Sequence, residues 1–265
     1  MKIYISADIE GVAGITNWDE ASKDSADYEE FRQQFTAEVA AACEGAIEAG
    51  ASEIIVKDAH ASGRNLYAAQ LPAEVQIIRG WSGHPQSMMQ DLDGSFDAAM
   101  MVGYHSAAAS DGNPLAHTFS GKVFRLSINE QRASEFLCNI YTAYLHKVPV
   151  VYVSGDKALC AEVSAFNSSI RTTAVTEGIG GSTMSLQPGV AAASIKRDVK
   201  AALTQNIQDF KCALPASFQV ELIFKVHADA YKASHYPGAR RKNATTVSFN
   251  SNDYLAVLTF LFFVI

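Results

Sequence analysis

Acidic and histidine side chains follow three short apolar segments in the first half of the chain. Asp8 and Glu10 close the first of these segments. His60 comes three residues after the second, and His105 comes three residues after the third. Residues two apart on a strand project to the same face, so Asp8 and Glu10 would repel each other unless a cation or solvent lay between them.

Each of these side chains has an ordinary interpretation when it is taken alone. A lone D-x-E more often caps a helix or a turn, and a single histidine after a strand is more often a loop residue than a ligand. It is much less common for three strand ends to carry residues of metal-binding type by chance. Because carboxylates mixed with imidazoles suit zinc or manganese better than calcium, the pattern predicts a divalent metal site.

Three further residues fit such a site less decisively. His117 lies twelve residues after His105 in a polar and aromatic loop, NPLAHTFSG, where it could be a ligand, a catalytic group or a plain loop residue. Glu130 and Glu135 both follow a fourth apolar segment. Five residues apart, they lie on different sides of a helix, so only one of them could face the site. The pattern does not choose between them.

The remaining polar candidates have simpler expected roles. We expect Asp58 to orient His60 or to cap a turn, and Asp156 to cap a helix that begins at KALCAEV. We expect His146 at the end of a helix. The roles of three other histidines are left open: His84, His227 and His235.

The surrounding elements alternate between strand and helix. We expect strands at 3–7, 53–57, 98–102, 123–128 and 150–153, and helices at 31–47 and 133–146. This alternation predicts an α/β fold of three layers, with a mostly parallel sheet covered by helices on both faces. In such a sheet, ligands bind beyond the carboxyl ends of the strands, where the metal-type residues lie.

A change of composition near Gly178 divides the chain into two expected domains. Residues 1–180 would form the metal-binding catalytic domain. Residues 181–265 would form a smaller C-terminal α/β unit that completes the pocket and the oligomer contacts. We expect its elements to be a helix at 190–204, strands at 220–226 and 245–249, and a final helix.

Composition and charge narrow the class of protein. The chain has 265 residues, is 48% hydrophobic and 18% charged, and carries a formal net charge of -7 without a basic stripe, so nucleic acid is not an expected partner. None of the four cysteines forms a CxxC pair, which favours free thiols and a cytoplasmic protein. The N-terminal residues do not have the pattern of a signal peptide. The apolar run 255–265 is shorter than the roughly 20 residues of a membrane-spanning helix, so no membrane contact is expected.

Several segments together resemble the DppA-type D-aminopeptidase family, peptidase family M55. The matching segments are KIYISADIEGVAGI, IIVKDAHASG, MMVGYHSAA, AHTFSG, INEQRASE and VPVVYVSGD, with a weaker match in YPGARRKNATTVSF. The resemblance covers nearly the whole chain. It is strong to about residue 156 and loose beyond 180, and its specificity lies in the order and spacing of the segments.

The resemblance implies a binuclear centre with two zinc ions per subunit. It implies that Asp8 bridges both metals, that Glu10 and His60 bind the first, and that His105 and Glu135 bind the second. Glu135 is thereby preferred to Glu130.

The resemblance also implies that His117 is catalytic and lies beside the metals without binding them. It further implies a ring-shaped homo-oligomer, usually a decamer of two stacked pentamers. The sequence departs from the family at Ser134, where glycine is common, and in an unusually apolar tail, FLFFVI. These departures bear on substrate preference and packing rather than on the ligands.

We therefore expect a zinc aminopeptidase that hydrolyses short peptides with an N-terminal D-amino acid, with manganese or another divalent metal as an alternative cofactor. One competing interpretation is a metallohydrolase of another amide or of a phosphoester. Only Lys57, Arg64 and Lys122 are basic near the motifs, which weighs against phosphate. The other competing interpretation is a non-catalytic peptide-binding protein associated with transport. The presence of His117 weighs against this interpretation.

Overall fold

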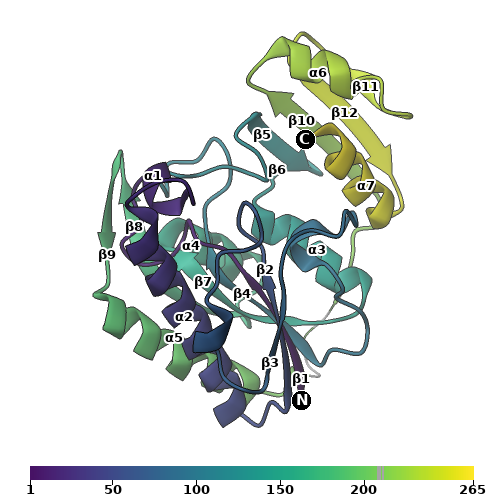
Figure 1. The fold of residues 1–265 in the computed structure, drawn as a ribbon. Helices are drawn as coiled ribbons and strands as arrows, with labels where there is room; N and C mark the ends of the chain where they lie inside the picture. The colour runs from purple at the N-terminus through teal and green to yellow at the C-terminus, as the bar shows by residue number, and fades with distance from the viewer. Residues whose placement is uncertain (208–209, 211) are drawn as a thin grey trace.

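The computed structural model describes residues 1–207, 210 and 212–265, which build two sheets (Figure 1). The larger sheet has seven strands. Their order across the sheet is β3 (Val75–Ile78), β2 (Glu53–Asp58), β1 (Lys2–Ala7), β4 (Ala98–Tyr104), β7 (Val150–Asp156), β8 (Arg171–Ile179) and β9 (Ser182–Ser185). Neighbouring strands are parallel except β9, which runs antiparallel to β8. The predicted mostly parallel sheet is confirmed.

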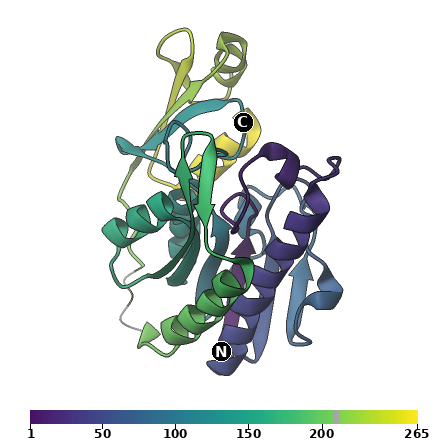
Figure 2. The same cartoon turned by 90° about the vertical axis from the view of Figure 1, so that its left-hand side faces the viewer.

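Helices cover both faces of this sheet. The helices α2 (Tyr28–Glu48) and α5 (Pro188–Leu203) pack side by side on one face (Figure 2). The helices α3 (Glu135–Leu145) and α4 (Lys157–Phe166) contribute to the core on the other face. Every residue of β4 and β7 is buried, as expected for strands covered on both faces. The three-layer arrangement is therefore confirmed.

The second sheet is antiparallel throughout, and one predicted strand lies in it unexpectedly. Its order is β11 (Arg240–Arg241), β12 (Thr246–Ser251), β10 (Phe218–Phe224), β5 (Val123–Ile128) and β6 (Gln131–Arg132). The expectation that β5 extends the parallel sheet is wrong. Asn129 and Glu130 both have positive φ and reverse the chain directly into β6, and the other neighbour of β5 is the distant strand β10.

The two sheets do not follow a division of the chain at residue 180. β5 and β6 precede that residue but lie in the smaller sheet, whereas β9 and α5 follow it and lie with the larger one. The division into domains 1–180 and 181–265 stays a prediction.

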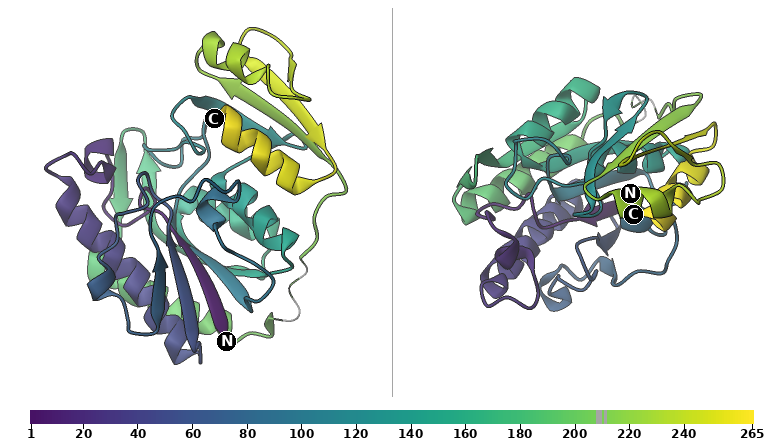
Figure 3. Two further views of the ribbon diagram at one scale, coloured as in Figure 1. Left: turned by 45° about the vertical axis from the view of Figure 1, so that its right-hand side comes forward. Right: turned by 90° about the horizontal axis from the view of Figure 1, so that it is seen from above.

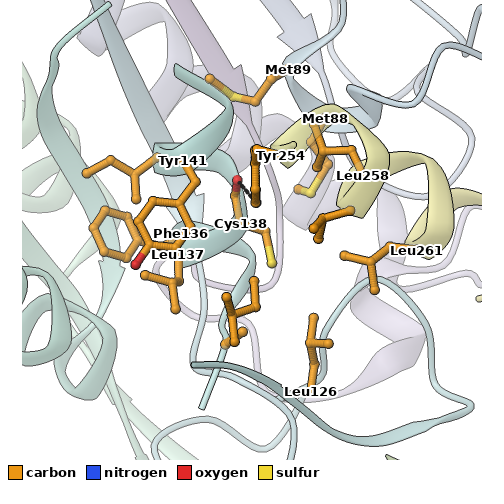
Figure 4. Packing of buried hydrophobic residues seen from close by; sticks show 14 of the residues in the cluster. Met88, Met89, Leu126, Phe136, Leu137, Cys138, Tyr141, Tyr254, Leu258 and Leu261 are labelled. Carbon is orange, nitrogen blue, oxygen red and sulfur yellow. Dashed lines mark hydrogen bonds between the residues drawn. The ribbon is translucent and has the colours of Figure 1, made fainter. Parts of the chain in front are cut away.

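The final helix, α7 (Tyr254–Val264), connects the smaller sheet to α3. Tyr254 Oη donates a hydrogen bond to the Cys138 carbonyl oxygen at 2.7 Å, and Leu258 and Leu261 lie near Met88 (Figure 4). The remaining helix of this part, α6 (His227–Ala233), packs on α7 (Figure 3). In the described part of the chain, no helix combines the length and apolar character needed to cross a bilayer.

Candidate metal centre

The site lies where the strand order of the large sheet changes direction. From β1 the chain proceeds to β2 and β3 on one side, and the later strands β4, β7 and β8 lie on the other. Asp8 and Glu10 leave the carboxyl end of β1, while His60 follows β2 and His105 follows β4. Such a switch point opens a crevice beyond the strand ends, which explains why these residues meet.

Two glycines allow the ends of β1 and β4 to approach each other. A Cβ atom on Gly11 would lie 1.8 Å from the Tyr104 carbonyl oxygen, and one on Gly103 would lie 2.1 Å from the Asp8 carbonyl oxygen. Gly103 also has a φ of +72°. The backbone amide of Gly11 donates to the Gly103 carbonyl oxygen at 2.9 Å, so the loop carrying Glu10 is tied directly to the strand that delivers His105.

The buried side chains form two groups that share one carboxylate. His60 Nδ1 lies 3.4 Å from Asp8 Oδ1 and 3.1 Å from Glu10 Oε2. His105 Nε2 lies 3.5 Å from Asp8 Oδ2 and 3.3 Å from Glu135 Oε2. Asp8 therefore presents one oxygen to each group. Each group has three potential ligand atoms within 4.8 Å of one another.

Backbone carbonyls fix which nitrogen of each imidazole faces the carboxylates. A carbonyl oxygen can only accept, so His60 Nε2 donates to Ala21 O at 2.7 Å and His105 Nδ1 donates to Ser106 O at 3.0 Å. In a neutral imidazole the remaining nitrogen then carries a lone pair. This arrangement, with one nitrogen donating to a carbonyl and the other free, is typical of histidines that bind metals.

The donor set fits a divalent cation. A lone pair aimed at a carboxylate oxygen is repulsive, and a cation between them turns that repulsion into coordination. Among the described residues, His105 Nε2 and Glu135 Oε2 are buried without a hydrogen-bond partner, which is costly unless another group satisfies them. Carboxylate and imidazole ligands suit zinc and related transition metals.

The pKa values of the cluster residues are shifted by burial and by the charges of their neighbours. Burial, reinforced by the neighbouring Glu10, raises the pKa of Asp8 to about 6. Burial also opposes ionisation of Glu10, but the His60 imidazole outweighs it and holds the pKa of Glu10 well below its ordinary value. Burial lowers the pKa of His105, yet Glu135 and Asp8 raise it well above its ordinary value. A metal ion would compete with protons for these atoms.

His117 lies at the rim of the cluster. Its ring stacks on His105 with centroids 4.4 Å apart, and it meets Trp18 edge to face at 5.2 Å. Nδ1 donates to the Leu115 carbonyl oxygen at 3.0 Å, which leaves Nε2 facing inward, 3.6 Å from Glu135 Oε1. With 15% of its side chain exposed, His117 is the most accessible of the six residues. It also groups with Glu10 and His105 as a possible ligand set.

The cluster opens into a pocket of about 440 Å³, within the usual range for small-ligand sites. Several of its lining residues were not predicted to line a pocket: Trp18, Trp81, Phe119, Asn139 and, from α7 and its C-cap, Leu258, Leu261, Phe262 and Ile265. One signal could have placed Trp18. It opens α1 (Trp18–Ala21), whose capping box of Asn17 and Glu20 is readable in the sequence.

The other sequence candidates lie in supporting or unrelated positions. Asp58 caps a turn by accepting from the Asn65 and Leu66 amides, and Asp156 is the N-cap of α4, as predicted. Glu130 lies exposed in the turn between β5 and β6, whereas Glu135, at the start of α3, lies in the cluster. The histidines divide as follows: His84 lines the pocket, His146 caps the end of α3, and His227 and His235 lie outside the pocket lining.

A buried carboxyl on α2 supports the loop that follows Glu10. Glu38 Oε1 accepts from the Ala13 amide at 3.0 Å and from Gln34 Nε2 at 3.0 Å, while Oε2 has no partner. Burial raises the pKa of Glu38 from 4.5 to about 7, although both hydrogen bonds act in the opposite direction. The folded protein therefore holds this proton at a pH where the unfolded chain has released it.

This difference predicts a pH-dependent stability. The folded state keeps the Glu38 proton up to about pH 7 and the unfolded state only to about 4.5, so stability falls as pH rises through that window. Relative to Glu38→Gln, the wild type should lose about 2 kcal/mol of unfolding free energy between about pH 5 and about pH 8. Urea denaturation at equal metal content measures this. Glu30→Gln, exposed on the same helix, is the matched control, and equal pH slopes for all three proteins would contradict the assignment.

Fold and site together define an α/β protein with a carboxylate–imidazole cluster of metal-binding type. The family model described as D-aminopeptidase, Peptidase M55, matches residues 1–263, and the chain belongs to this family. The D-aminopeptidase of Bacillus subtilis (strain 168) is 30% identical over 257 residues, which cover 96% of this chain and 93% of that protein.

A solved structure agrees with this membership. The zinc-dependent D-aminopeptidase DppA from Bacillus subtilis, described as a self-compartmentalizing protease, is similar with a TM-score of 0.93 and 28% identity. The similarity covers 100% of this chain and 96% of that one.

Proposed function

We propose that the protein is a binuclear zinc aminopeptidase that releases the N-terminal D-amino acid from short peptides. The observation that carries the proposal is the Asp8 carboxylate shared between two histidine–carboxylate groups. Membership in the D-aminopeptidase family and the zinc dependence of the DppA relative support the metal, the reaction and the D-configuration.

The five buried side chains would hold the two ions. Asp8 would bridge them, Glu10 and His60 would bind the first, and His105 and Glu135 would bind the second. When bound, zinc supplies Lewis acidity that polarises a carbonyl and lowers the pKa of a water. The hydrogen bonds from His60 and His105 to backbone carbonyls hold the ligand nitrogens in place beforehand, which limits the entropy lost on binding.

The chain's own residues would orient the substrate and move its protons. The carboxylates of the cluster offer an anchor for the free N-terminal ammonium of a peptide. His117 keeps Nδ1 on the Leu115 carbonyl, so Nε2 is the atom that can give a proton to, or take one from, a peptide in the pocket.

The alternatives fit the pocket less well. Phosphoester substrates usually recruit arginine or lysine, and in the described part of the chain no such side chain lines the pocket. A purely structural metal would not require an accessible imidazole beside it, and His117 reaches the solvent side of the cluster.

We also infer that the protein forms a ring-shaped homo-oligomer, a decamer, in the cytoplasm. Ile179 and Met184 on the β8–β9 hairpin and Phe263 on α7 are more than half exposed, so they would be free to contact a neighbouring subunit. The DppA relative is described as self-compartmentalizing, which supports assembly. The free state of all four cysteines supports a reducing compartment.

The test is the release of D-alanine from D-Ala-D-Ala by the purified protein, with L-Ala-L-Ala as the matched substrate. Release is expected from the D-peptide, with loss of activity after chelation and recovery when zinc is returned. Release that survives complete metal removal would contradict the metal mechanism, and no release from either peptide would contradict the peptidase.

A further inference from the structure

The pocket has two chemically different ends. One end holds the carboxylates and imidazoles of the cluster. Outside the cluster, the lining combines the apolar side chains of the α7 segment, Trp81 and Phe119 with polar ones, among them Ser82, His84 and Gln86. Among the described residues, no lysine or arginine lines either end. Beyond the cluster, a bound peptide therefore meets apolar and polar side chains but no lysine or arginine among the described residues.

Helix α7 presents one apolar stripe to this pocket. Leu258, Leu261, Phe262 and Ile265 follow the spacing i, i+3, i+4 and i+7, which places them on one face of a helix. The helix is anchored by contacts on both sides. On the side away from the stripe, Phe260 stacks on Phe249 with ring centroids 4.6 Å apart. Tyr254, one turn before Leu258 on the side of the stripe, donates its hydroxyl to the Cys138 carbonyl oxygen. These contacts fix which face of α7 meets the pocket, and Figure 4 shows the bond from Tyr254 to Cys138.

The aromatic side chain of Trp81, which also lines the pocket, is held in place by its neighbours. Trp81 is 42% exposed, yet its Nε1 donates to the Ala61 carbonyl oxygen at 2.8 Å. The buried ammonium of Lys57 lies 3.9 Å from the centroid of the Trp81 ring and donates to the Gly80 carbonyl oxygen at 2.6 Å. The Trp81 ring is therefore oriented before any ligand arrives, which lowers the entropic cost of binding against it.

We propose that the apolar α7 side of this pocket binds the side chain of the residue that follows the scissile bond, and that Phe262 is a specificity-determining residue. This inference rests on the proposed function. With the N-terminal ammonium at the carboxylates and the scissile carbonyl beside the cluster, the rest of the peptide must extend away from it, toward α7. The carboxylate of a dipeptide finds no lysine or arginine among the described lining residues, so discrimination depends on the apolar contact of the second side chain.

The proposal predicts a preference for D-Ala-D-Phe over D-Ala-D-Ser. The wild type should show a kcat/KM ratio of about 10 or more in favour of D-Ala-D-Phe, the scale expected from a hydrophobic pocket. Phe262→Ser should lower this ratio by roughly 5-fold or more. Phe262→Ser should lower kcat/KM more for D-Ala-D-Phe than for D-alaninamide, which has no second residue, because the leaving group of D-alaninamide does not reach α7.

Leu255→Ser is the matched control. Leu255 lies on the same helix, is 39% exposed and does not line the pocket, so this variant reports any effect that acts through the helix or the assembly. Its substrate ratio should equal that of the wild type. A wild-type ratio near 1, or an equal change of ratio in both variants, would overturn the inference while leaving the peptidase intact. Failure to hydrolyse all substrates, D-alaninamide included, would instead remove the proposed function and the inference with it.

Discussion

Replacing Asp8 by alanine is expected to remove both metal ions from the protein. Asp8 is buried, and its two oxygens face different groups, one toward His60 and the other toward His105. Loss of this carboxylate removes one potential ligand from each group. The remaining imidazoles and carboxylates are then too few to hold either ion. Elemental analysis of purified Asp8→Ala should find well under one zinc per chain, and D-peptide hydrolysis should be lost.

His105→Ala provides the comparison for this result. His105 faces only the group that contains Glu135, so its removal should deplete mainly one ion and leave the Glu10–His60 group loaded. Asp19→Ala, which removes an exposed carboxylate outside the cluster, should retain the wild-type zinc content. Two metals per chain in Asp8→Ala would refute the bridging role.

Replacing His117 by alanine should slow catalysis without removing metal. His117 Nε2 faces the cluster from its accessible side, and its other nitrogen is held by the Leu115 carbonyl. An acid–base group in this position contributes a factor of roughly 10² to 10⁴ to kcat. His117→Ala should therefore keep near-normal zinc content while kcat for D-Ala-D-Ala falls by about that factor.

The control is His84→Ala, which changes a histidine of the same pocket outside the metal cluster. Its kcat should fall far less than that of His117→Ala. Because His117 also groups with Glu10 and His105, a metal-depleted His117→Ala protein is the informative contrary outcome. It would make His117 a ligand rather than the proton-transfer group.

The large sheet and the position of the cluster were predictable from local sequence. The strands β1, β2 and β4 are short and have apolar, mostly buried centres, and each is followed within a few residues by Asp8, His60 or His105. The convergence of these residues follows from the general geometry of parallel sheets. The family resemblance favoured Glu135 over Glu130 as the metal ligand. The spacing of the two residues showed only that both could not face the same site.

The smaller sheet and the far wall of the pocket could not be predicted in the same way. β5 has the same local character as a strand of the large sheet, and its membership is decided by pairing with β10, which is distant in sequence. The orientation of α7 was equally hidden, because the helix is apolar on nearly every side. Only the anchoring of Tyr254 and Phe260 in the core decides that Phe262 faces the pocket.

The comparison of D-Ala-D-Ala with L-Ala-L-Ala tests the central claim most directly. The purified, zinc-loaded protein should release alanine from the D-peptide at a much higher kcat/KM than from the L-peptide, and chelation should abolish this release until zinc is returned. Equal hydrolysis of the two enantiomers, or a rate that is indifferent to chelation, would contradict the account of this protein as a zinc-dependent D-aminopeptidase.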